Sequence, residues 1–167
     1  MQIYLVDKIS SDNKVILTQD DAKHCAIVMR NKTGDTIWGT NGQGVAYQMK
    51  IVEIQKNQVI AKVQETISNF GEPFQPVYLA FAILSNPSRM EILVEKAVEL
   101  GVTHLLPFAA KRSEKKNLNI ERMKRICIAA MKQCKRSKIP ELQLFQNTND
   151  LFQYANSIKS LKLIGFC

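Results

Sequence analysis

The sequence predicts a small β domain followed by an α/β domain with a parallel sheet. Three observations predict this class: alternating apolar and polar residues fill much of the first 70 positions, a segment rich in glycine and proline interrupts them, and strand-like and helix-like segments alternate afterwards. The chain has 167 residues, of which 46% are apolar, so it can form one mid-sized core or two small ones.

The first part is predicted to contain five strands and one helix. Apolar side chains alternate in 45–51 and 59–63, as in strands buried on one face, and Asn41-Gly42 is a hairpin signal. Residues 20–30 begin with two acidic residues and end at Arg30, which is typical of one short helix. We therefore expect a helix-containing barrel or sandwich with strands at 2–6, 14–18, 35–40, 45–51 and 58–63.

The segment 69–76, NFGEPFQP, is the predicted domain boundary and divides the chain into residues 1–72 and 73–167. Residues 77–84 are then continuously apolar, as expected for a central parallel strand covered on both faces. A helix should follow, since Asn86 can cap it, Pro87 suits its first turn and Gly101 can end it. Further strands are predicted at 104–109, 141–145 and 161–166, and further helices at 121–137 and 149–156.

Charge is distributed unevenly along the chain. Residues 1–74 hold eight Lys or Arg and eight Asp or Glu, whereas residues 75–167 hold fifteen Lys or Arg and seven Asp or Glu. The segment 111–138 alone holds eleven basic and two acidic residues, a net charge of +9. Such a local excess indicates an anionic partner at one place.

The predicted helix 121–137 has two different faces. At 100° per residue its apolar residues gather on one side, and four basic residues gather on the other. A solvated surface helix is the ordinary explanation, but we expect no acidic residues at i±4 to relieve the repulsion. The preceding loop also leaves the carboxyl end of a strand, where open α/β sheets bind ligands. We therefore predict that nucleic acid phosphates bind Lys111, Arg112, Lys115, Lys116, Arg122, Arg125, Lys132 and Arg136.

Several other classes of site and location are not indicated by the sequence. The four cysteines form no C-x-x-C pair and have no nearby histidine cluster, so neither zinc nor a disulfide framework is predicted. No nucleotide-binding glycine motif is present. No apolar run reaches the ~20 residues that span a bilayer, and the amino terminus lacks a signal-peptide pattern. We expect a cytoplasmic protein without metal or membrane partners.

Three segments of the chain resemble the bacterial ribosomal RNA small subunit methyltransferase E family, of the SPOUT class. Residues 24–35, HCAIVMRNKTGD, are similar to the family's His-x₅-Arg-x-Lys-x-Gly-Asp segment. Residues 94–113, VEKAVELGVTHLLPFAAKRS, are similar to its most recognisable stretch. A third motif is similar to residues 129–140, AAMKQCKRSKIP. The resemblance implies a PUA-like RNA-binding β-barrel, an α/β methyltransferase domain with a trefoil knot, and homodimers.

The resemblance also implies the reaction, methyl transfer from S-adenosylmethionine to N3 of a uridine in 16S ribosomal RNA of the small subunit. By position it implies catalytic roles for Arg112, Ser113, Gln133 and Arg136, with Arg30 and Lys32 helping to hold RNA on the first domain. Lys132 stands where many relatives carry a glutamate.

The family's glycine-rich cofactor segment and knot lie beyond the position of Cys167, so no cofactor-binding residue is predicted in this chain. Two hypotheses follow. The chain is the amino-terminal part of an RNA methyltransferase, expected to be inactive on its own, or it is a non-catalytic RNA-binding module. An in-frame continuation of the gene with a Gly-Pro-Glu-Gly-Gly-like segment would favour the enzyme.

Overall fold

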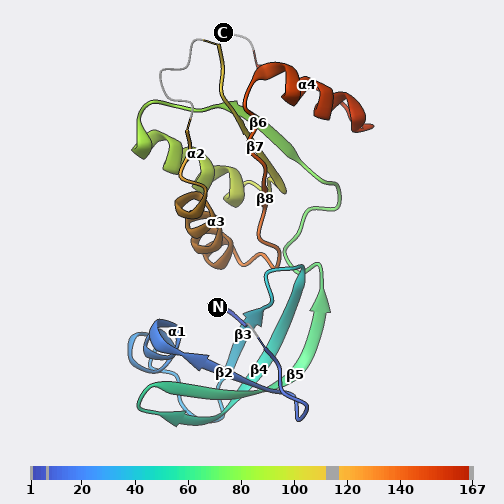
Figure 1. Ribbon diagram of the computed structural model, residues 1–167. Helices are drawn as coiled ribbons and strands as arrows, with labels where there is room; N and C mark the ends of the chain where they lie inside the picture. Colours follow the sequence, from blue (N-terminus) through green and yellow to red (C-terminus); the bar gives the residue numbers. More distant parts are fainter. Residues whose placement is uncertain (1, 7, 112–116, 166–167) are drawn as a thin grey trace.

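The computed structural model describes residues 2–6, 8–111 and 117–165, which form two domains stacked end to end (Figure 1). The first domain is a five-stranded sheet with strand order β1-β3-β4-β5-β2. All neighbours in it are antiparallel except β1 and β3. Its elements are β1 (Ile3–Leu5), β2 (Lys14–Thr18), α1 (Gln19–Lys23), η1 (His24–Val28), β3 (Thr36–Thr40), β4 (Val45–Gln55) and β5 (Gln58–Ser68).

Alternation in the strands places one face of this sheet in the first hydrophobic core. Met49 and Ile51 of β4 and Val59 and Ala61 of β5 are all fully buried, as their spacing predicts. The five strands are at the predicted places, although β4 and β5 extend further than predicted. In the pairing of the described residues β1 and β2 are the two edges of the sheet, so closure into a barrel stays a prediction.

The predicted single helix after β2 is two helical segments, α1 followed by the π-helix η1. In η1 the Met29 amide donates to the carbonyl of His24 at 2.9 Å, which is the wider i to i+5 spacing. The side chain of Asn31 donates to the carbonyl of Cys25 at 3.2 Å, so this carbonyl of the π-helix has a hydrogen-bond partner. Cys25 itself is buried in the first core.

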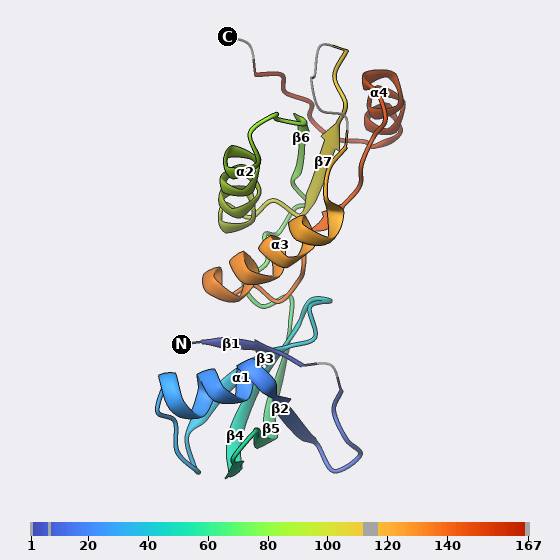
Figure 2. The ribbon, with the colours of Figure 1, turned by 60° about the vertical axis from the view of Figure 1, so that its left-hand side comes forward.

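The second domain is a three-stranded parallel sheet with strand order β6-β7-β8, with helices on both faces. Successive residues of β7 point to opposite sides: Leu105 joins a core under α2 and α3, and Leu106 joins a smaller core under α4. Figure 2 shows α2 and α4 on opposite sides of the sheet. The elements are β6 (Tyr78–Ala82), α2 (Pro87–Glu99), β7 (His104–Phe108), α3 (Ile120–Cys134), β8 (Glu141–Leu142) and α4 (Thr148–Ser157).

The signals predicted for α2 are confirmed. The side chain of Asn86 accepts a hydrogen bond from the amide of Arg89 at 3.2 Å, and Pro87 occupies the first turn. Gly101 has φ of +91°, in the left-handed region where glycine ends helices without a Cβ penalty.

Three predictions for the second domain are wrong. In the pairing of the described residues β6 lies at the edge of the sheet, and β7 is the central strand. Residues 161–165, predicted to begin a fourth strand, form no strand among the described residues, and Leu161 is 85% exposed. The basic helix ends at Cys134 rather than at residue 137, because Lys135 adopts a left-handed conformation with φ of +62°.

Candidate nucleic-acid interface

Helix α3 ends beside the first domain, and it carries three of the predicted basic residues, Arg122, Arg125 and Lys132 (Figures 1 and 2). Asn119 caps its start by accepting a hydrogen bond from the amide of Arg122 at 3.0 Å. The predicted apolar face is confirmed, since Met123, Cys127 and Met131 are buried in the second-domain core. The opposite face therefore points away from the sheet.

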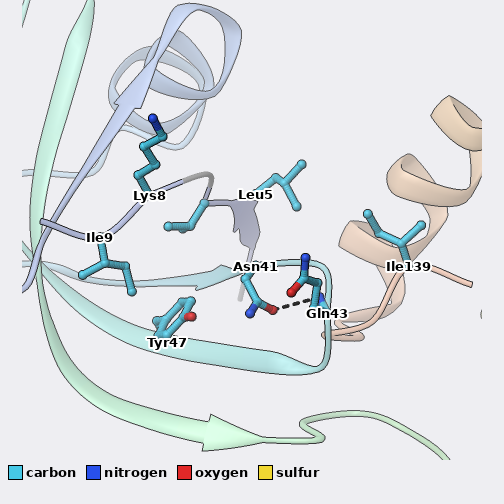
Figure 3. Close-up of a pocket in the computed structure, with 8 residues that line it drawn as sticks. Leu5, Lys8, Ile9, Asn41, Gln43, Tyr47 and Ile139 are labelled. Atoms are coloured by element: carbon cyan, nitrogen blue, oxygen red, sulfur yellow. Dashed lines mark hydrogen bonds between the residues drawn. The ribbon is translucent and has the colours of Figure 1, made fainter.

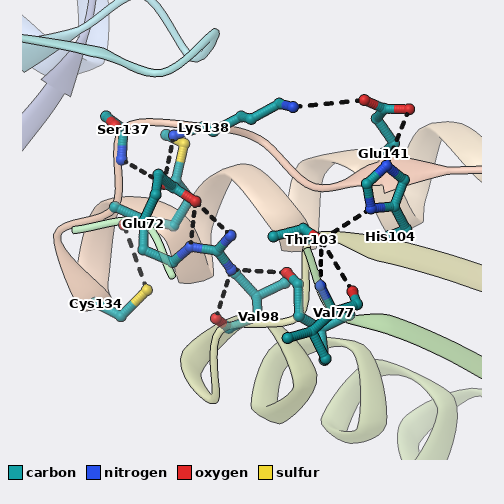
Figure 4. Close-up of polar contacts among 12 residues, drawn as sticks. Glu72, Val77, Val98, Thr103, His104, Cys134, Ser137, Lys138 and Glu141 are labelled. Atoms are coloured by element: carbon teal, nitrogen blue, oxygen red, sulfur yellow. Dashed lines mark hydrogen bonds and ion pairs between the residues drawn. The ribbon is translucent and has the colours of Figure 1, made fainter. Parts of the chain in front are cut away.

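Arg136 is not on that exposed face, and its placement there was wrong. Because the helix ends at Cys134, the chain turns and the guanidinium of Arg136 enters the domain junction, where it is 3% exposed. Nε and Nη2 donate to Oε2 of Glu72 at 3.2 and 2.7 Å. Nη1 donates to the carbonyls of Val98 and Val102 at 2.9 and 2.8 Å (Figure 4). These contacts bury the guanidinium of Arg136 within the protein, so its charge is not exposed to an RNA.

Glu72 joins the two domains through both of its carboxylate oxygens. While Oε2 accepts from Arg136, Oε1 accepts from the backbone amides of Ser137 and Lys138 at 2.9 and 2.8 Å. Gly71 beside it has φ of +71°, and a Cβ there would lie 2.5 Å from the carbonyl oxygen of Lys135. The linker thus fits tightly against the turn after α3, and only glycine allows this approach.

The hairpin between β3 and β4 contacts the same turn from the other side. Thr40 donates from its hydroxyl to the carbonyl of Ser137 at 2.8 Å, and the amide of Gly44 donates to the same carbonyl at 2.9 Å. The amide of Ile139 donates to the carbonyl of Gly42 at 2.8 Å. These hydrogen bonds fix the orientation of the first domain relative to α3.

Two of the predicted basic residues of α3 pair with acidic residues from other elements. Lys132 lies 2.9 Å from Asp21 of α1, and its side chain is only 21% exposed. Arg122 lies 2.7 Å from Glu91 of α2, although its side chain remains 57% exposed. The expectation that no acidic residue relieves the repulsion is wrong. Within α3, Glu121 stands four residues before Arg125 and pairs with Lys124 at 3.0 Å, and the tertiary fold supplies Asp21 and Glu91.

Arg125 and Gln133 remain exposed on α3, and neither forms an ion pair or side-chain hydrogen bond with the residues that the structure describes. Lys111, at the end of the described part of the β7 loop, is also exposed. Arg112, Ser113, Lys115 and Lys116 lie outside the described residues, and their roles stay predictions.

Arg30 and Lys32 are exposed on the loop after η1, in the first domain. Arg30 has a left-handed φ of +53°, and the amide of Lys32 donates to the carboxylate of Asp35 at 2.7 Å, so the loop has a fixed turn. The preceding residues Ile27 and Val28 are also exposed. A loop with apolar and basic side chains together can contact both bases and phosphates.

The predicted residues are therefore divided between two places. Arg122 and Arg125 lie in the first half of α3, whereas Lys132 and Gln133 lie at its end, where Lys132 pairs with Asp21 of α1. The ten residues from Arg122 to Lys132 correspond to about 15 Å at 1.5 Å per residue. A ligand that reached both ends would have to be long, as a nucleic acid is.

Two grooves at the domain junction were not predicted from the sequence, because each combines segments that are distant in the chain. The larger, of about 500 Å³, lies between the segment after β1 and the β3–β4 hairpin, with Ile139 from the second domain at one end (Figure 3). The smaller, of about 280 Å³, includes Leu5, Asp21 and Lys132. Neither lies at the carboxyl ends of the parallel strands.

Both histidines contact other side chains of the protein. His104 stacks on Tyr78 with ring centroids 4.1 Å apart, and its Nδ1 lies 2.8 Å from Oγ1 of Thr103 (Figure 4). Burial lowers the pKa of His104, and the carboxylate of Glu141 opposes this in part. The Nδ1 of His24 lies 3.3 Å from the hydroxyl of Tyr4 in the first domain.

Among the described residues no cluster of three potential metal ligands occurs. The described part of the chain also contains no helix with the length and apolarity needed to cross a membrane.

Comparison with known proteins identifies the family. Residues 71–165 match the family model of the RNA methyltransferase domain, and residues 17–64 match that of the RNA methyltransferase PUA domain. The chain belongs to this RNA methyltransferase family. The resemblance inferred from the motifs is confirmed, and so is the class of fold, a PUA domain followed by a parallel-sheet α/β domain. The trefoil knot and the boundary at residue 72 stay predictions.

The ribosomal RNA small subunit methyltransferase E of Mesomycoplasma hyopneumoniae is 34% identical over 121 residues, which are 70% of this chain and 52% of that protein. A probable rRNA methyltransferase from Porphyromonas gingivalis has a TM-score of 0.78 at 25% identity, covering 90% of this chain and 63% of that one. The fold is also similar to that of a ribosomal RNA small subunit methyltransferase E from Neisseria gonorrhoeae bound to S-adenosyl methionine. The TM-score is 0.77 at 23% identity, covering 90% of this chain and 64% of that chain. The chain spans 52% and 60% of two of its curated relatives.

Proposed function

We propose that the protein methylates N3 of a uridine in 16S ribosomal RNA, in the cytoplasm, as a homodimer. The observation that carries the proposal is the pair of matches along the chain, a PUA domain over residues 17–64 and an RNA methyltransferase domain over residues 71–165. The exposed basic residues on both domains and the rigid junction between them support RNA as the substrate.

S-adenosylmethionine would supply the methyl group. The crevice where open parallel sheets bind ligands lies beyond the carboxyl ends of β6, β7 and β8. The two grooves described above lie at the domain junction, and we assign neither of them to the cofactor. The part of the reaction that we assign to the described residues is the binding and orientation of the RNA.

The exposed residues Arg30, Lys32 and Arg125 are proposed to contact RNA phosphates. None of the three side chains has an ion-pair partner among the described residues, so their charges are available to a polyanion. Arg122 would contribute less, because Glu91 already neutralises it at 2.7 Å. Each phosphate contact on duplex-like RNA releases counterions and contributes about 0.9 to the salt slope.

Titrations of small-subunit RNA over a range of salt test this surface. Replacing Arg30, Lys32 and Arg125 together with Ala should reduce the salt slope by about 2 to 3. A matched triple variant replaces three lysines that already have acidic partners, so it changes net charge equally and should leave the slope nearly unchanged. Its positions are Lys14, Lys96 and Lys124. Equal slopes for the two variants would contradict the assignment of this surface.

The reaction itself is tested with the full product of the gene. Small subunits from cells that lack the corresponding methylation are incubated with labelled S-adenosylmethionine, and the modified nucleotide is identified by mass spectrometry. Label at N3 of one uridine supports the proposal. RNA binding without methyl transfer would instead indicate a non-catalytic RNA-binding module.

A further inference from the structure

The larger groove at the domain junction has apolar and polar walls from both domains. Leu5 and Ile139 form apolar walls, and both also pack against the core of the second domain. Tyr47 of β4 lies along the hairpin side, and Lys8 and Gln43 are exposed (Figure 3). The volume of about 500 Å³ is within the range of about 300–1,000 Å³ that small-molecule sites occupy.

Three polar side chains in this groove have no partner among the described residues. Elsewhere at the junction the polar groups of Arg136 and Glu72 are all paired within the protein. Within the described residues, by contrast, the hydroxyl of Tyr47, the side-chain amide of Gln43 and the ammonium of Lys8 form no hydrogen bond or ion pair with other groups of the protein. These groups can therefore bind a ligand without breaking an internal contact.

Asn41 is held in one orientation at the same place. Its Oδ1 accepts hydrogen bonds from the amides of Gln43 and Val45 at 2.8 and 3.2 Å, which directs the side-chain NH₂ away from the hairpin backbone (Figure 3). That NH₂ has no partner among the described residues, so it is a pre-organised donor. The hydrogen bond from Ile139 to Gly42 at 2.8 Å fixes the hairpin against the second domain.

The combination matches the chemistry of an unpaired nucleotide. A tyrosine ring can stack on a base, side-chain amides can read the hydrogen-bonding edge of a base, and a lysine can neutralise a phosphate. Lys8 and Gln43 lie on the exposed side of the groove, so a bound nucleotide could remain part of a longer chain.

We propose that this groove binds one unpaired nucleotide of the RNA, with Tyr47 against the base, Asn41 and Gln43 on its edge and Lys8 at a phosphate. The proposal rests on the proposed function in that RNA is the ligand. It adds a binding site where the PUA domain meets the methyltransferase domain, so that an unpaired nucleotide helps to place the RNA on both domains.

The test uses fluorescence anisotropy with labelled hexauridylate and with a 12-base-pair RNA duplex. Tyr47→Leu removes the aromatic surface and should weaken hexauridylate binding about fivefold or more, since stacking contributes at least that much per base. Asn41→Asp retains the Oδ1 acceptor but replaces the donor, and Lys8→Gln removes the charge; each should weaken binding by several-fold without altering the fold. Lys56→Gln, an equal charge change on the exposed β4–β5 turn, is the control.

Duplex binding should be unchanged in all four variants, because paired bases cannot enter the groove. The proposal is overturned if the groove variants bind hexauridylate as the wild type does, or if duplex and single strand weaken alike. It is also overturned if the wild-type protein binds the duplex but not hexauridylate. Methyl transfer by the full gene product is measured separately, so either proposal can fail while the other stands.

Discussion

Replacing Glu72 with Ala should destabilise the protein far more than replacing an exposed acidic residue. Glu72 is the carboxylate partner of the buried Arg136, at 2.7 Å, and it also accepts two backbone amides at residues 137 and 138. The side chains of Glu72 and Arg136 are 7% and 3% exposed. Removal of one partner therefore leaves a charge that water reaches poorly.

The expected loss in the free energy of unfolding is about 3–5 kcal/mol, the range for breaking a buried ion pair by removing one partner. That is a large fraction of the ~5–15 kcal/mol by which domains are stable. Replacing Arg136 with Met in the same chain removes the uncompensated charge. The double variant should therefore be about 1–3 kcal/mol more stable than the sum of the two single effects predicts.

Urea unfolding, followed by two probes, measures these quantities. Trp38 is the single tryptophan and stacks on Phe70 of the linker region with centroids 5.0 Å apart, so its fluorescence reports the first domain. Far-ultraviolet circular dichroism mainly reports the longer helices, which are in the second domain. The two transitions should coincide in the wild type and separate in Glu72→Ala, because the ion pair couples the domains.

Glu91→Ala is the control, since it breaks the more accessible Arg122–Glu91 pair, in which the side chains of Arg122 and Glu91 are 57% and 27% exposed. Exposed pairs contribute about 0–1 kcal/mol. The reasoning is refuted if Glu72→Ala costs no more than Glu91→Ala, or if the double variant shows no coupling.

Three further predictions concern single residues. Gly71→Ala should lower the free energy of unfolding, measured by urea titration, more than Gly34→Ala does. Both glycines have a left-handed φ, but of the two only Gly71 has backbone atoms close to the position of a Cβ, with the carbonyl oxygen of Lys135 at 2.5 Å. Burial lowers the pKa of His104, so the contribution of this side chain to stability should be fully present above about pH 6.5 and should decline as pH falls toward the folded-state pKa. Thermal melts of the wild type and of His104→Asn between pH 5 and 8 measure the difference. Burial raises the pKa of the Cys127 thiol to about 11, so pulsed alkylation at pH 8 with peptide mass spectrometry should label it only after unfolding.

Each of these predictions has a contrary outcome. Equal losses for the two glycine variants would show that the linker tolerates a Cβ. A His104→Asn variant with the same pH dependence as the wild type would show that other groups account for it. Rapid alkylation of native Cys127 would show that the core under α3 opens readily.

Local sequence signals determined most of the secondary structure. The cap at Asn86, the end at Gly101 and the alternation in β4 and β5 depend on residues within a few positions of each other, so a single sequence contains the necessary information. The family motifs are also contiguous, which is why the resemblance could be found before the fold was known. Arg30 and Arg125 are exposed, and the RNA-binding roles predicted for them stay predictions.

The sequence could not determine which charges would be free. Arg136 pairs with Glu72 across 64 positions, and Lys132 pairs with Asp21 across 111, so the tertiary fold brings the acids that the local sequence lacks. The left-handed turn at Lys135 decides that Arg136 enters the junction, since a helix continuing to residue 137 would have kept it on the basic face.

The grooves at the junction likewise exist only in the tertiary structure. Tyr47, Asn41 and Ile139 come from a strand, a hairpin and the segment after α3, and no spacing in the sequence relates them. The strand predicted at 161–166 also depends on context, because apolar residues form a strand only where a neighbouring strand accepts their backbone hydrogen bonds. Periodicity thus predicted most of the elements and contiguous motifs indicated the family, whereas the pairing of distant charges and backbone groups decided which side chains remain unpaired among the described residues.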